Sequence, residues 1–527
     1  MFARSRSRRF EVPSGVLVLT AALTACTPSV FGQERSNAGF LVVALKEAPD
    51  RLDPTRAGSY VGRIVFANMC EKLYDVDDRL QLVPQLASAL PGITDGGLTY
   101  TIPLRQGVRF NDGTPLTAAA VKISLDRDKK DKQSQRTSEL TSLKAVDVVD
   151  PATVRLRLSR PFAPLTSVLA DRAGMVMSPA ALQRYGDNFA QHPVCVGPFS
   201  FSSEPSPDEI NLARSEFYYD RDKVRLPGVT FRAITDDSVR AADLRAGDVD
   251  VIDRASPQDA VSLSVDPGLT VRTVTSLGYQ GITINVGNAN GYDKPPATPN
   301  LPLARDVRLR KAFELSLDRD VINKVVFNGA YLPDCSPIPP ASPLAVSVPC
   351  SRRDLQQARE LIRQSGVPTP ITVRMMVQNS PLQVQIGTII QAMAKDAGFD
   401  VRVEPSEFAT SLQRGRNGQF DTYQVGWSGR LDADQNIAQE YLPGSALNYG
   451  GLIDTEINRL INAARETTDP ALRKQLYTQL VTRANDQLGI IYLYHEKYVL
   501  AMRKNISGVV FRDDGLIRVG TARIDPR

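Results

Sequence analysis

Strand patterns and helix patterns follow one another along nearly the whole of this 527-residue chain. Residues 40–45 are continuously apolar, which predicts a buried strand, and residues 61–73 have the apolar spacing of a helix. Strand patterns return at residues 98–110 and 154–158, with a helix expected to begin after Thr117. Because a single hydrophobic core rarely grows beyond about 250–300 residues, the sequence predicts an α/β protein of two or three lobes.

Short polar signals mark where some of these elements turn or begin. Asn111-Asp112-Gly113 is a tight-turn signal between strand-like residues and a helix. Asp306 is expected to cap one helix and Asp320 the next. The apolar face expected for that second helix comprises Val321, Ile322, Val325 and Val326.

The charge pattern argues against a nucleic-acid partner. The chain is 42% hydrophobic and 23% charged, shares that are typical of a globular protein. Its formal net charge is only +5, and much of this charge belongs to arginines at the N-terminus. Because no basic tract and no aromatic-rich sheet motif is present, we expect no binding to DNA or RNA.

The N-terminus has the features of an export signal. Four arginines lie within residues 4–9, and the apolar stretch at residues 15–23 is far shorter than the ~20 residues of a membrane span. The motif LTAC, which ends at Cys26, resembles the lipobox of bacterial lipoproteins. We expect a signal peptide at residues 1–25, lipidation of Cys26 and a tether at residues 26–39. The alternative is an ordinary signal peptide followed by a chance cysteine, and the general and twin-arginine export routes both stay open.

Four cysteines remain beyond Cys26. An even number outside the cytoplasm favours two disulfides, for which three pairings exist. We favour Cys335 with Cys350, because these residues enclose a proline-rich loop that has little else to hold it. Cys70 with Cys195 then follows by elimination. The alternative is four free, buried thiols.

The motifs of common enzymes are missing from the sequence. It contains no Gly-x-Ser-x-Gly, no dinucleotide fingerprint and no phosphate-binding loop. Its two histidines are His192 and His495, and the segment HEKYV at 495–499 has valine where a zinc protease needs its second histidine. We therefore expect no metal, no cofactor and no catalytic residues. A hydrolase assembled from scattered Asp, Glu and Ser side chains is the alternative.

Six segments together resemble one family. Residues 104–121, LRQGVRFNDGTPLTAAAV, match a hallmark of the peptide/nickel-type bacterial extracellular solute-binding proteins, family 5. The other matches, in order, are LDP at 52–54 with CEKLY at 70–74, GPF at 197–199, LRAGDVD at 244–250, DVRLRKA at 306–312 with DR at 318–319, and GWSG at 426–429. The resemblance covers about residues 40–515.

The resemblance implies a periplasmic-binding-protein-like α/β fold of type II, cluster C. Two main lobes and an inserted extra domain are expected, with a hinge where two strands cross near residues 283 and 495. Lobe I would comprise residues 40–73, 194–283 and 496–527, lobe II the insertion 74–193, and lobe III residues 284–495. Such lobes close over a ligand held between them.

The resemblance also implies a function without catalysis. The chain would be the exported, lipid-anchored substrate-binding subunit of an ABC importer, a monomer that takes peptides to a permease and an ATPase. Family members with other ligands leave chelated nickel, haem, an opine or a glutathione-like solute as alternatives. A binding fold reused in envelope regulation or in catalysis is a further alternative.

Peptide-binding relatives suggest where the ligand would lie. The loop containing Gly58, Ser59 and Tyr60 would lend main-chain groups to an extended peptide. Its alternative is a plain surface loop. Trp427, the one tryptophan of the chain, would line the site or stack on the ligand, unless it is a core residue. Its neighbours Ser428 and Gly429 are included as candidates.

Arg430 departs from the pattern of the peptide-binding relatives. They carry an aspartate three residues after the tryptophan, and that aspartate pairs with the α-amine of the ligand. An arginine there would repel an amine and favour a carboxylate or another anion. Alternatively, Arg430 pairs with Asp432 or Asp434 and is structural. Asp432 would then either bind the amine itself or only turn the chain.

Two more pairs of residues are candidates near the expected hinge. Tyr279 and Gln280 come just before a strand that enters lobe III, so they would face the cleft. Asn448 and Tyr449 precede two glycines and would do likewise. For both pairs a structural role is the alternative.

Overall fold

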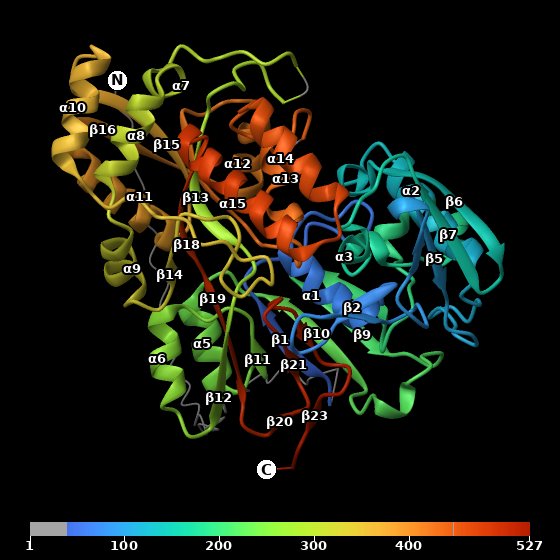
Figure 1. Cartoon of the computed structure of the whole chain (residues 1–527). Helices are drawn as coiled ribbons and strands as arrows, with labels where there is room; N and C mark the ends of the chain where they lie inside the picture. The colour runs from blue at the N-terminus through green and yellow to red at the C-terminus, as the bar shows by residue number, and fades with distance from the viewer. Residues whose placement is uncertain (1–38, 293, 446, 527) are drawn as a thin grey trace, which may run out of the picture. The chain divides into compact units, whose positions relative to one another are not determined.

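The computed structural model describes residues 39–292, 294–445 and 447–526 (Figure 1). The expected signal peptide, Cys26 and the tether up to residue 38 lie outside the described residues. The α-helices of the described residues are α1 (Tyr60–Met69), α2 (Ala118–Lys130), α3 (Leu165–Val168), α4 (Pro179–Tyr185), α5 (Asp237–Ala246), α6 (Pro257–Ser264), α7 (Pro302–Arg305), α8 (Val307–Ser316), α9 (Arg319–Phe327), α10 (Leu355–Ser365), α11 (Pro381–Lys395), α12 (Phe408–Arg416), α13 (Ala438–Tyr441), α14 (Thr455–Glu466) and α15 (Pro470–Gln487).

A seven-stranded sheet, here called the first sheet, draws its strands from the beginning, the middle and the end of the chain. Its order is β12 (Leu269–Thr275), β19 (Lys497–Arg503), β11 (Val251–Ile252), β1 (Leu41–Leu45), β10 (Gly228–Ala233), β9 (Glu209–Arg214) and β8 (Phe199–Ser206). β1 pairs in parallel with β10 and β11. Val43 packs in a core with α1, and Val42 packs on the other face with α5, so β1 is buried on both faces as its continuous apolar run predicts.

A six-stranded sheet, the second sheet, belongs to the later part of the chain (Figure 1). Its order is β14 (Leu332–Pro333), β18 (Ile490–His495), β13 (Tyr279–Ile284), β17 (Thr422–Trp427), β15 (Ile371–Gln378) and β16 (Phe399–Ser406). Apolar side chains of α8, α9, α10 and α11 pack with this sheet in one core. Those of α13, α14 and α15 pack in another, together with Tyr279 and Tyr492. The site loop described below therefore leaves β17 from a sheet that is covered on both sides.

A four-stranded antiparallel sheet, the third sheet, lies within residues 92–158. Its order is β4 (Gly92–Thr94), β5 (Thr99–Pro103), β7 (Thr153–Leu158) and β6 (Leu143–Asp150), and α2 packs on β6 and β7. Three small pairs complete the strands, namely β2 (Tyr74–Val76) with β3 (Leu82–Pro84), β20 (Ile506–Ser507) with β23 (Arg523–Ile524), and β21 (Val510–Phe511) with β22 (Ile517–Arg518).

The chain crosses between the first and second sheets at two places, between β12 and β13 and between β18 and β19. The backbone N–H of Ser276 donates to the carbonyl of Glu496 at 2.9 Å, so the two crossing segments are hydrogen-bonded to each other. The first crossing lies at residues 276–278 rather than near residue 283, because β13 pairs with β17 and β18 of the second sheet along its length.

The hallmark segment forms a turn and a capped helix that tie distant segments together. Gly113 has a φ of 83°, a backbone conformation that favours glycine, and Thr117 caps α2 by accepting from the Ala120 N–H. The Asn111 side chain donates to the Phe199 carbonyl at 2.9 Å. The Asp112 carboxylate accepts from the Ser178 hydroxyl at 2.5 Å. The segment therefore has a structural role in this fold.

One helix start differs from the expectation. Asp306 caps α8 as predicted, but α9 is capped by Asp318, whose side chain accepts from the Val321 N–H. The helix therefore begins earlier than a cap at Asp320 would allow. Of its expected apolar face, Ile322 and Val326 are buried, whereas Val321 and Val325 are exposed.

Both favoured cysteine pairings are present. Cys70 is joined to Cys195, and both are buried in the core beneath α1. Cys335 is joined to Cys350 across the proline-rich loop, with Cys335 buried and Cys350 exposed. The first bridge connects the end of α1 with the segment that leads into β8.

Candidate functional site

Asp171 joins three segments that are far apart in the sequence. It caps a short 3-10 turn, η3 (Arg172–Gly174), that follows α3. Asp171 Oδ1 accepts from Arg63 Nε of α1 at 3.2 Å. Asp171 Oδ2 lies 2.8 Å from Arg430 Nε in the loop after β17. One carboxylate thus brings together α1, the segment after α3 and the loop of the second sheet.

Two further arginines extend this contact into a buried group of charges. We define the arginine cluster as Arg63, Arg136, Arg172, Arg430, Asp171 and Glu139. Arg136 pairs with Glu139 at 2.7 Å. The carbonyl of Ala57 accepts from Arg172 at 2.9 Å and from Arg136 at 3.2 Å, so these two guanidinium groups lie beside each other. All members of the cluster are buried.

The charges of the cluster alter one another's titration. Burial alone would raise the pKa of Asp171, but Arg63 and Arg430 outweigh it and hold that pKa well below its usual range. Burial and the neighbouring Arg63 lower the pKa of Arg430 to about 10. Burial and Arg136 lower the pKa of Arg172 well below its usual range. The cluster thus holds four guanidinium groups and two carboxylates, all of them buried.

Trp427 and Arg430 are held by one asparagine. The Arg430 guanidinium carbon lies 4.5 Å from the centre of a Trp427 ring, within the range of a cation–π contact. Asn436 Oδ1 accepts from Trp427 Nε1 at 3.1 Å and from the Arg430 backbone N–H at 2.7 Å. Trp427 is partly buried and packs against the core of α13, α14 and α15.

The loop after β17 rests on the first crossing segment. A side chain at Gly278 would place its Cβ 1.9 Å from the Trp427 carbonyl oxygen, and one at Gly429 would place it 2.1 Å from the Leu277 carbonyl carbon. Gly429 also has a φ of 77°. Only glycine fits this approach, which puts Trp427, Ser428 and Arg430 directly against the hinge expected between the lobes. Ser428 is partly buried and accepts from Arg430 at 3.2 Å.

The main-chain donors of the loop before α1 are already engaged. The N–H groups of Gly58 and Ser59 donate to the Asp50 carboxylate at 2.8 and 3.1 Å. Ser59 caps α1, and its carbonyl accepts from Arg172 at 3.2 Å. The Tyr60 hydroxyl donates to the Gly515 carbonyl at 2.6 Å, and its ring is buried. A peptide that adds to this loop as a strand would have to replace these bonds.

The structural alternative proposed for Arg430 is wrong in its choice of partner. Asp432 is paired in bidentate fashion with Arg473, at 2.8 and 2.7 Å. Asp434 is paired with Arg465 at 2.7 and 3.1 Å. Because nearby aspartates are taken by their own arginines, Arg430 turns to Asp171 instead. Asp432 also caps the following 3-10 turn, so it turns the chain in addition to carrying an ion pair.

Tyr279 and Gln280 lie beside Trp427 in the second sheet. Tyr279 is opposite Trp427 in the pairing of β13 with β17, and it packs edge-on against Tyr492 with ring centres 4.8 Å apart. Tyr279 is buried, whereas Gln280 is partly buried and lies opposite Gly426. Tyr279 therefore supports the strand that carries Trp427.

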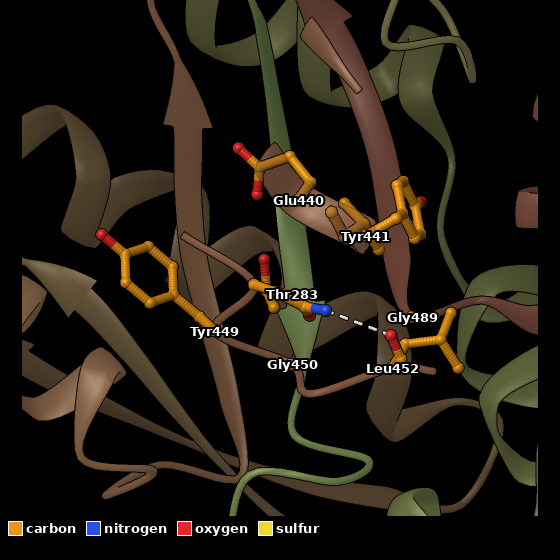
Figure 2. Close-up of a pocket in the computed structure, with 9 residues that line it drawn as sticks. Thr283, Glu440, Tyr441, Tyr449, Gly450, Leu452 and Gly489 are labelled. Atoms are coloured by element: carbon orange, nitrogen blue, oxygen red, sulfur yellow. Dashed lines mark hydrogen bonds between the residues drawn. The ribbon is translucent and has the colours of Figure 1, made fainter. Parts of the chain in front are cut away.

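Asn448 and Tyr449 belong to a small pocket within the region of the second sheet (Figure 2). Asn448 donates to the Leu452 carbonyl at 3.1 Å, which closes its loop. Burial raises the pKa of Glu440 to about 8, against the opposing hydrogen bond from Tyr279. The pocket is lined by Thr283, Glu440, Tyr441, Asn448, Tyr449, Gly450, Leu452, Gly489 and Ile490. Tyr279 contacts Glu440 of this pocket and lies opposite Trp427 in the sheet.

The described residues do not provide the metal ligands of a typical site. Their one close group of three or more such side chains is Asp334, Cys335 and Cys350, and both cysteines are in a disulfide. His495 is buried at the end of a strand rather than on a helix, between the Gly278 carbonyl and Asp334 Oδ2, at 2.6 and 3.0 Å. Within the part of the chain that the structure describes, no helix combines the length and apolarity of a membrane span.

Sequence reasoning missed Asp171, Arg63, Arg136, Arg172 and Asn436. A signal for one pair was available, because Asp171 and Arg172 interrupt the otherwise nearly uncharged run at residues 161–183. An adjacent acid and base inside such a run need partners from elsewhere in the fold. The sequence holds no comparable signal for Asn436.

The model of the bacterial extracellular solute-binding proteins, family 5, matches residues 81–448. The glutathione-binding protein GsiB of Salmonella typhimurium is 28% identical over 486 residues, which cover 89% of this chain and 91% of that protein. Among solved structures, the binding protein AgaA of A. tumefaciens R10 in complex with agropinic acid has a TM-score of 0.81 at 25% identity, covering 93% of this chain and 99% of that one.

A dipeptide-binding protein of Pseudoalteromonas sp. SM9913 in complex with Met-Leu has a TM-score of 0.82 at 19% identity, covering 92% of this chain and all of its own (100%). These similarities show an α/β fold of the type II periplasmic binding proteins, cluster C, with two lobes.

Proposed function

The chain belongs to the bacterial extracellular solute-binding proteins of family 5, and we propose that it captures small solutes of the peptide class between its lobes and delivers them to the permease of an ABC importer. Its relatives bind ligands of related size, since glutathione is a tripeptide and Met-Leu a dipeptide. A binding protein needs no reactive group, which agrees with the missing enzyme motifs.

The observation that carries this proposal is the meeting of three segments at Asp171, beside Trp427. We assign α1 and the first sheet to lobe I, residues 74–193 to lobe II and the second sheet to lobe III, with hinges at residues 276–278 and 496. Arg63, Asp171 and Arg430 then come from three different lobes. A solute held at that point contacts every lobe and favours the closed arrangement by its differential binding.

Delivery to a membrane permease agrees with the anchor proposed at Cys26. The lipid would hold the protein at the membrane while residues 26–39 let it reach the transporter. Metabolic labelling with a radioactive fatty acid should mark the wild-type protein but not a Cys26→Ser variant. A wild-type protein that carries no lipid would exclude the anchor and leave solute binding untouched.

Trp427 provides the test of solute binding because it is the one tryptophan of the chain. Titration with glutathione and with dipeptides and tripeptides should change its fluorescence with a dissociation constant of about 1–10 μM or lower. A Trp427→Phe variant serves as the spectroscopic control, and calorimetry checks the affinity independently. Conversion of a titrated solute into product, or no heat and no fluorescence change with any of them, would contradict the proposal.

A further inference from the structure

His495 is fully buried, and each of its ring nitrogens faces an oxygen that accepts hydrogen bonds. Nδ1 lies 2.6 Å from the carbonyl oxygen of Gly278, and Nε2 lies 3.0 Å from Oδ2 of Asp334. A neutral imidazole carries one N–H group and can satisfy only one of these oxygens. Because imidazole is a stronger base than a carboxylate, the second proton belongs on the ring. His495 is therefore an imidazolium ion in this arrangement, paired with the Asp334 carboxylate.

One of the two bonds of His495 joins the segments at which the chain crosses between the first and second sheets. Gly278 belongs to the first crossing, and His495 ends β18 directly before the second crossing at Glu496. The two crossings share a backbone bond, from the Ser276 N–H to the Glu496 carbonyl at 2.9 Å. The His495 side chain adds a second bond between them, and that bond depends on a proton.

The first crossing segment touches the loop that carries Trp427. A Cβ at Gly278 would lie 1.9 Å from the Trp427 carbonyl oxygen, so the two backbones are in contact. The Asn436 side chain donates to the Leu277 carbonyl at 3.2 Å, and the same asparagine accepts from Trp427 Nε1. A shift of the crossing segment is therefore felt at Trp427.

Among the described residues, Asp334 is the charged group that contacts the ring. Its Oδ1 accepts from the Cys335 N–H at 2.7 Å, which leaves Oδ2 for His495. Asp334 is partly exposed, so a proton can pass between the pair and solvent. Further ionisable side chains on the segments around the ring are Tyr279, Tyr331, Tyr494, Glu496 and Lys497.

Loss of the proton removes one of the two bonds. The remaining N–H of the neutral ring goes to the stronger acceptor, and a carboxylate is a stronger acceptor than a carbonyl. The lone pair of Nδ1 is then left facing the Gly278 oxygen without a hydrogen between them, which is unfavourable. The bond between the crossing segments is therefore the one that is lost as the pH rises.

We propose that His495 and Asp334 form a proton-dependent brace across the hinge, so that the affinity for solute is highest when the pair is protonated and falls as the pH rises. The inference rests on the proposed function and adds a regulation to it. The brace is made in the arrangement that brings the three segments together at Asp171, so its loss disfavours that arrangement relative to others. Histidine is the side chain that ordinarily changes charge between about pH 5 and 8.

The proton can be followed directly, because the chain contains only two histidines, His192 and His495. NMR of the mature, untagged protein with isotope-labelled histidine reports the ring nitrogens from about pH 5.5 to about pH 8.5. We expect His495 to carry two ring protons at the acidic end and one at the basic end. A His192→Gln variant assigns the signals. A His495 ring with the same protonation at both ends would overturn the inference.

Asp334→Asn separates the brace from a purely structural role. The amide oxygen of asparagine can accept from the Cys335 N–H while its N–H donates to Nε2, so a neutral ring keeps both of its contacts. Calorimetry with S-methylglutathione, which has no thiol to attack the disulfides, measures affinity at each pH. From about pH 5.5 to about pH 8, wild-type affinity should fall about tenfold relative to that of the variant.

Other groups that titrate in this range do not disturb the comparison. Burial raises the pKa of Glu71 to about 7 and that of Glu440 to about 8, but both residues are present in wild type and variant alike. Their effects, and those of the solute itself, cancel in the ratio of the two affinities. His192→Gln is the control, because His192 is exposed and stacks on Tyr185, so its pH profile should follow that of wild type.

Parallel pH profiles of wild type and Asp334→Asn would overturn the inference and leave the proposed function standing. An equal loss of affinity at every pH in the variant would overturn it too, because a structural role of Asp334 alone predicts that result. Thermal unfolding verifies that each variant is folded. Absence of binding by S-methylglutathione and other small peptides at any pH, with folded protein, would remove the proposed function and this inference together.

Discussion

The Asp171 carboxylate lies 2.8 Å from the Arg430 guanidinium, and both side chains are buried. This ion pair connects the segment after α3 with the loop that carries Trp427. It gives Arg430 a buried carboxylate partner within the protein.

Replacing Asp171 should destabilise the protein strongly. An Asp171→Asn variant leaves Arg63 and Arg430 buried without their shared carboxylate, and breaking a buried pair costs about 3–5 kcal/mol. Chemical unfolding measures this loss of free energy. Asp147→Asn is the control, since the exposed pair of Asp147 with Arg157 should matter by less than about 1 kcal/mol. Similar losses of unfolding free energy in the two variants would show that the buried pair of Asp171 contributes no more to stability than an exposed ion pair does.

Glu71 should make stability depend on pH. Burial raises the pKa of Glu71 to about 7, although the hydroxyls of Tyr218 and Tyr219 donate to it. The folded state therefore holds a proton that the unfolded state has released above about pH 4.5. Stability falls as the pH rises from about 4.5 to 7, and it stays at the lower level above that range.

A Glu71→Gln variant should lose much of that dependence, because glutamine keeps the shape and carries no charge. The free energy of unfolding of the variant minus that of wild type should increase by on the order of 2–3 kcal/mol from pH 4.5 to pH 8. Urea unfolding of both proteins at the two pH values measures the difference. A difference that does not change with pH would mean that Glu71 titrates normally in the folded protein.

The two disulfides should contribute unequally. In the chain-entropy model the bridge between Cys70 and Cys195, with a sequence separation of 125, is worth about 5 kcal/mol. The bridge between Cys335 and Cys350, with a separation of 15, is worth about 3 kcal/mol. Paired Cys→Ser variants, compared by unfolding under non-reducing conditions, should therefore rank in that order. The opposite ranking would mean that the disulfides do not stabilise the protein mainly by restricting the unfolded chain.

Asn436 should control the environment of Trp427. Asn436→Ala removes the acceptor shared by Trp427 Nε1 and the Arg430 N–H, and an unsatisfied buried donor costs about 1–3 kcal/mol. We expect a shifted tryptophan emission and weaker solute binding. Asn462 of α14 accepts an exposed hydrogen bond from Arg160, so Asn462→Ala should leave the emission unchanged. Unchanged emission in the Asn436 variant would mean that the loop does not depend on this asparagine.

Local patterns in the sequence predicted much of the fold. The apolar run of β1, the caps at Thr117 and Asp306, and the turn at Gly113 depend on neighbouring residues, so a reading of short segments finds them. The cap of α9 was placed wrongly because Asp318 and Asp320 both fit a helix start, and only tertiary packing decides which turns of the helix are buried.

The candidate site was less predictable because its contacts join distant segments. Trp427 and Arg430 were identified from the resemblance, but Asp171 could not be matched to Arg430 from spacing when Asp432 and Asp434 stood nearer. Those aspartates are taken by Arg473 and Arg465 of the following helices. Which arginine pairs with which aspartate is set by the three-dimensional arrangement of the chain. Spacing along the sequence does not determine it.

The proposed function requires that this protein hold a small solute of the peptide class and release it unchanged. Native mass spectrometry of protein purified without unfolding tests this claim most directly. We predict a mass excess that disappears on denaturation and a released compound of the peptide class, of the same mass before and after incubation with the protein. A released compound that is chemically altered, or protein that stays bare after incubation with peptides, would contradict the account.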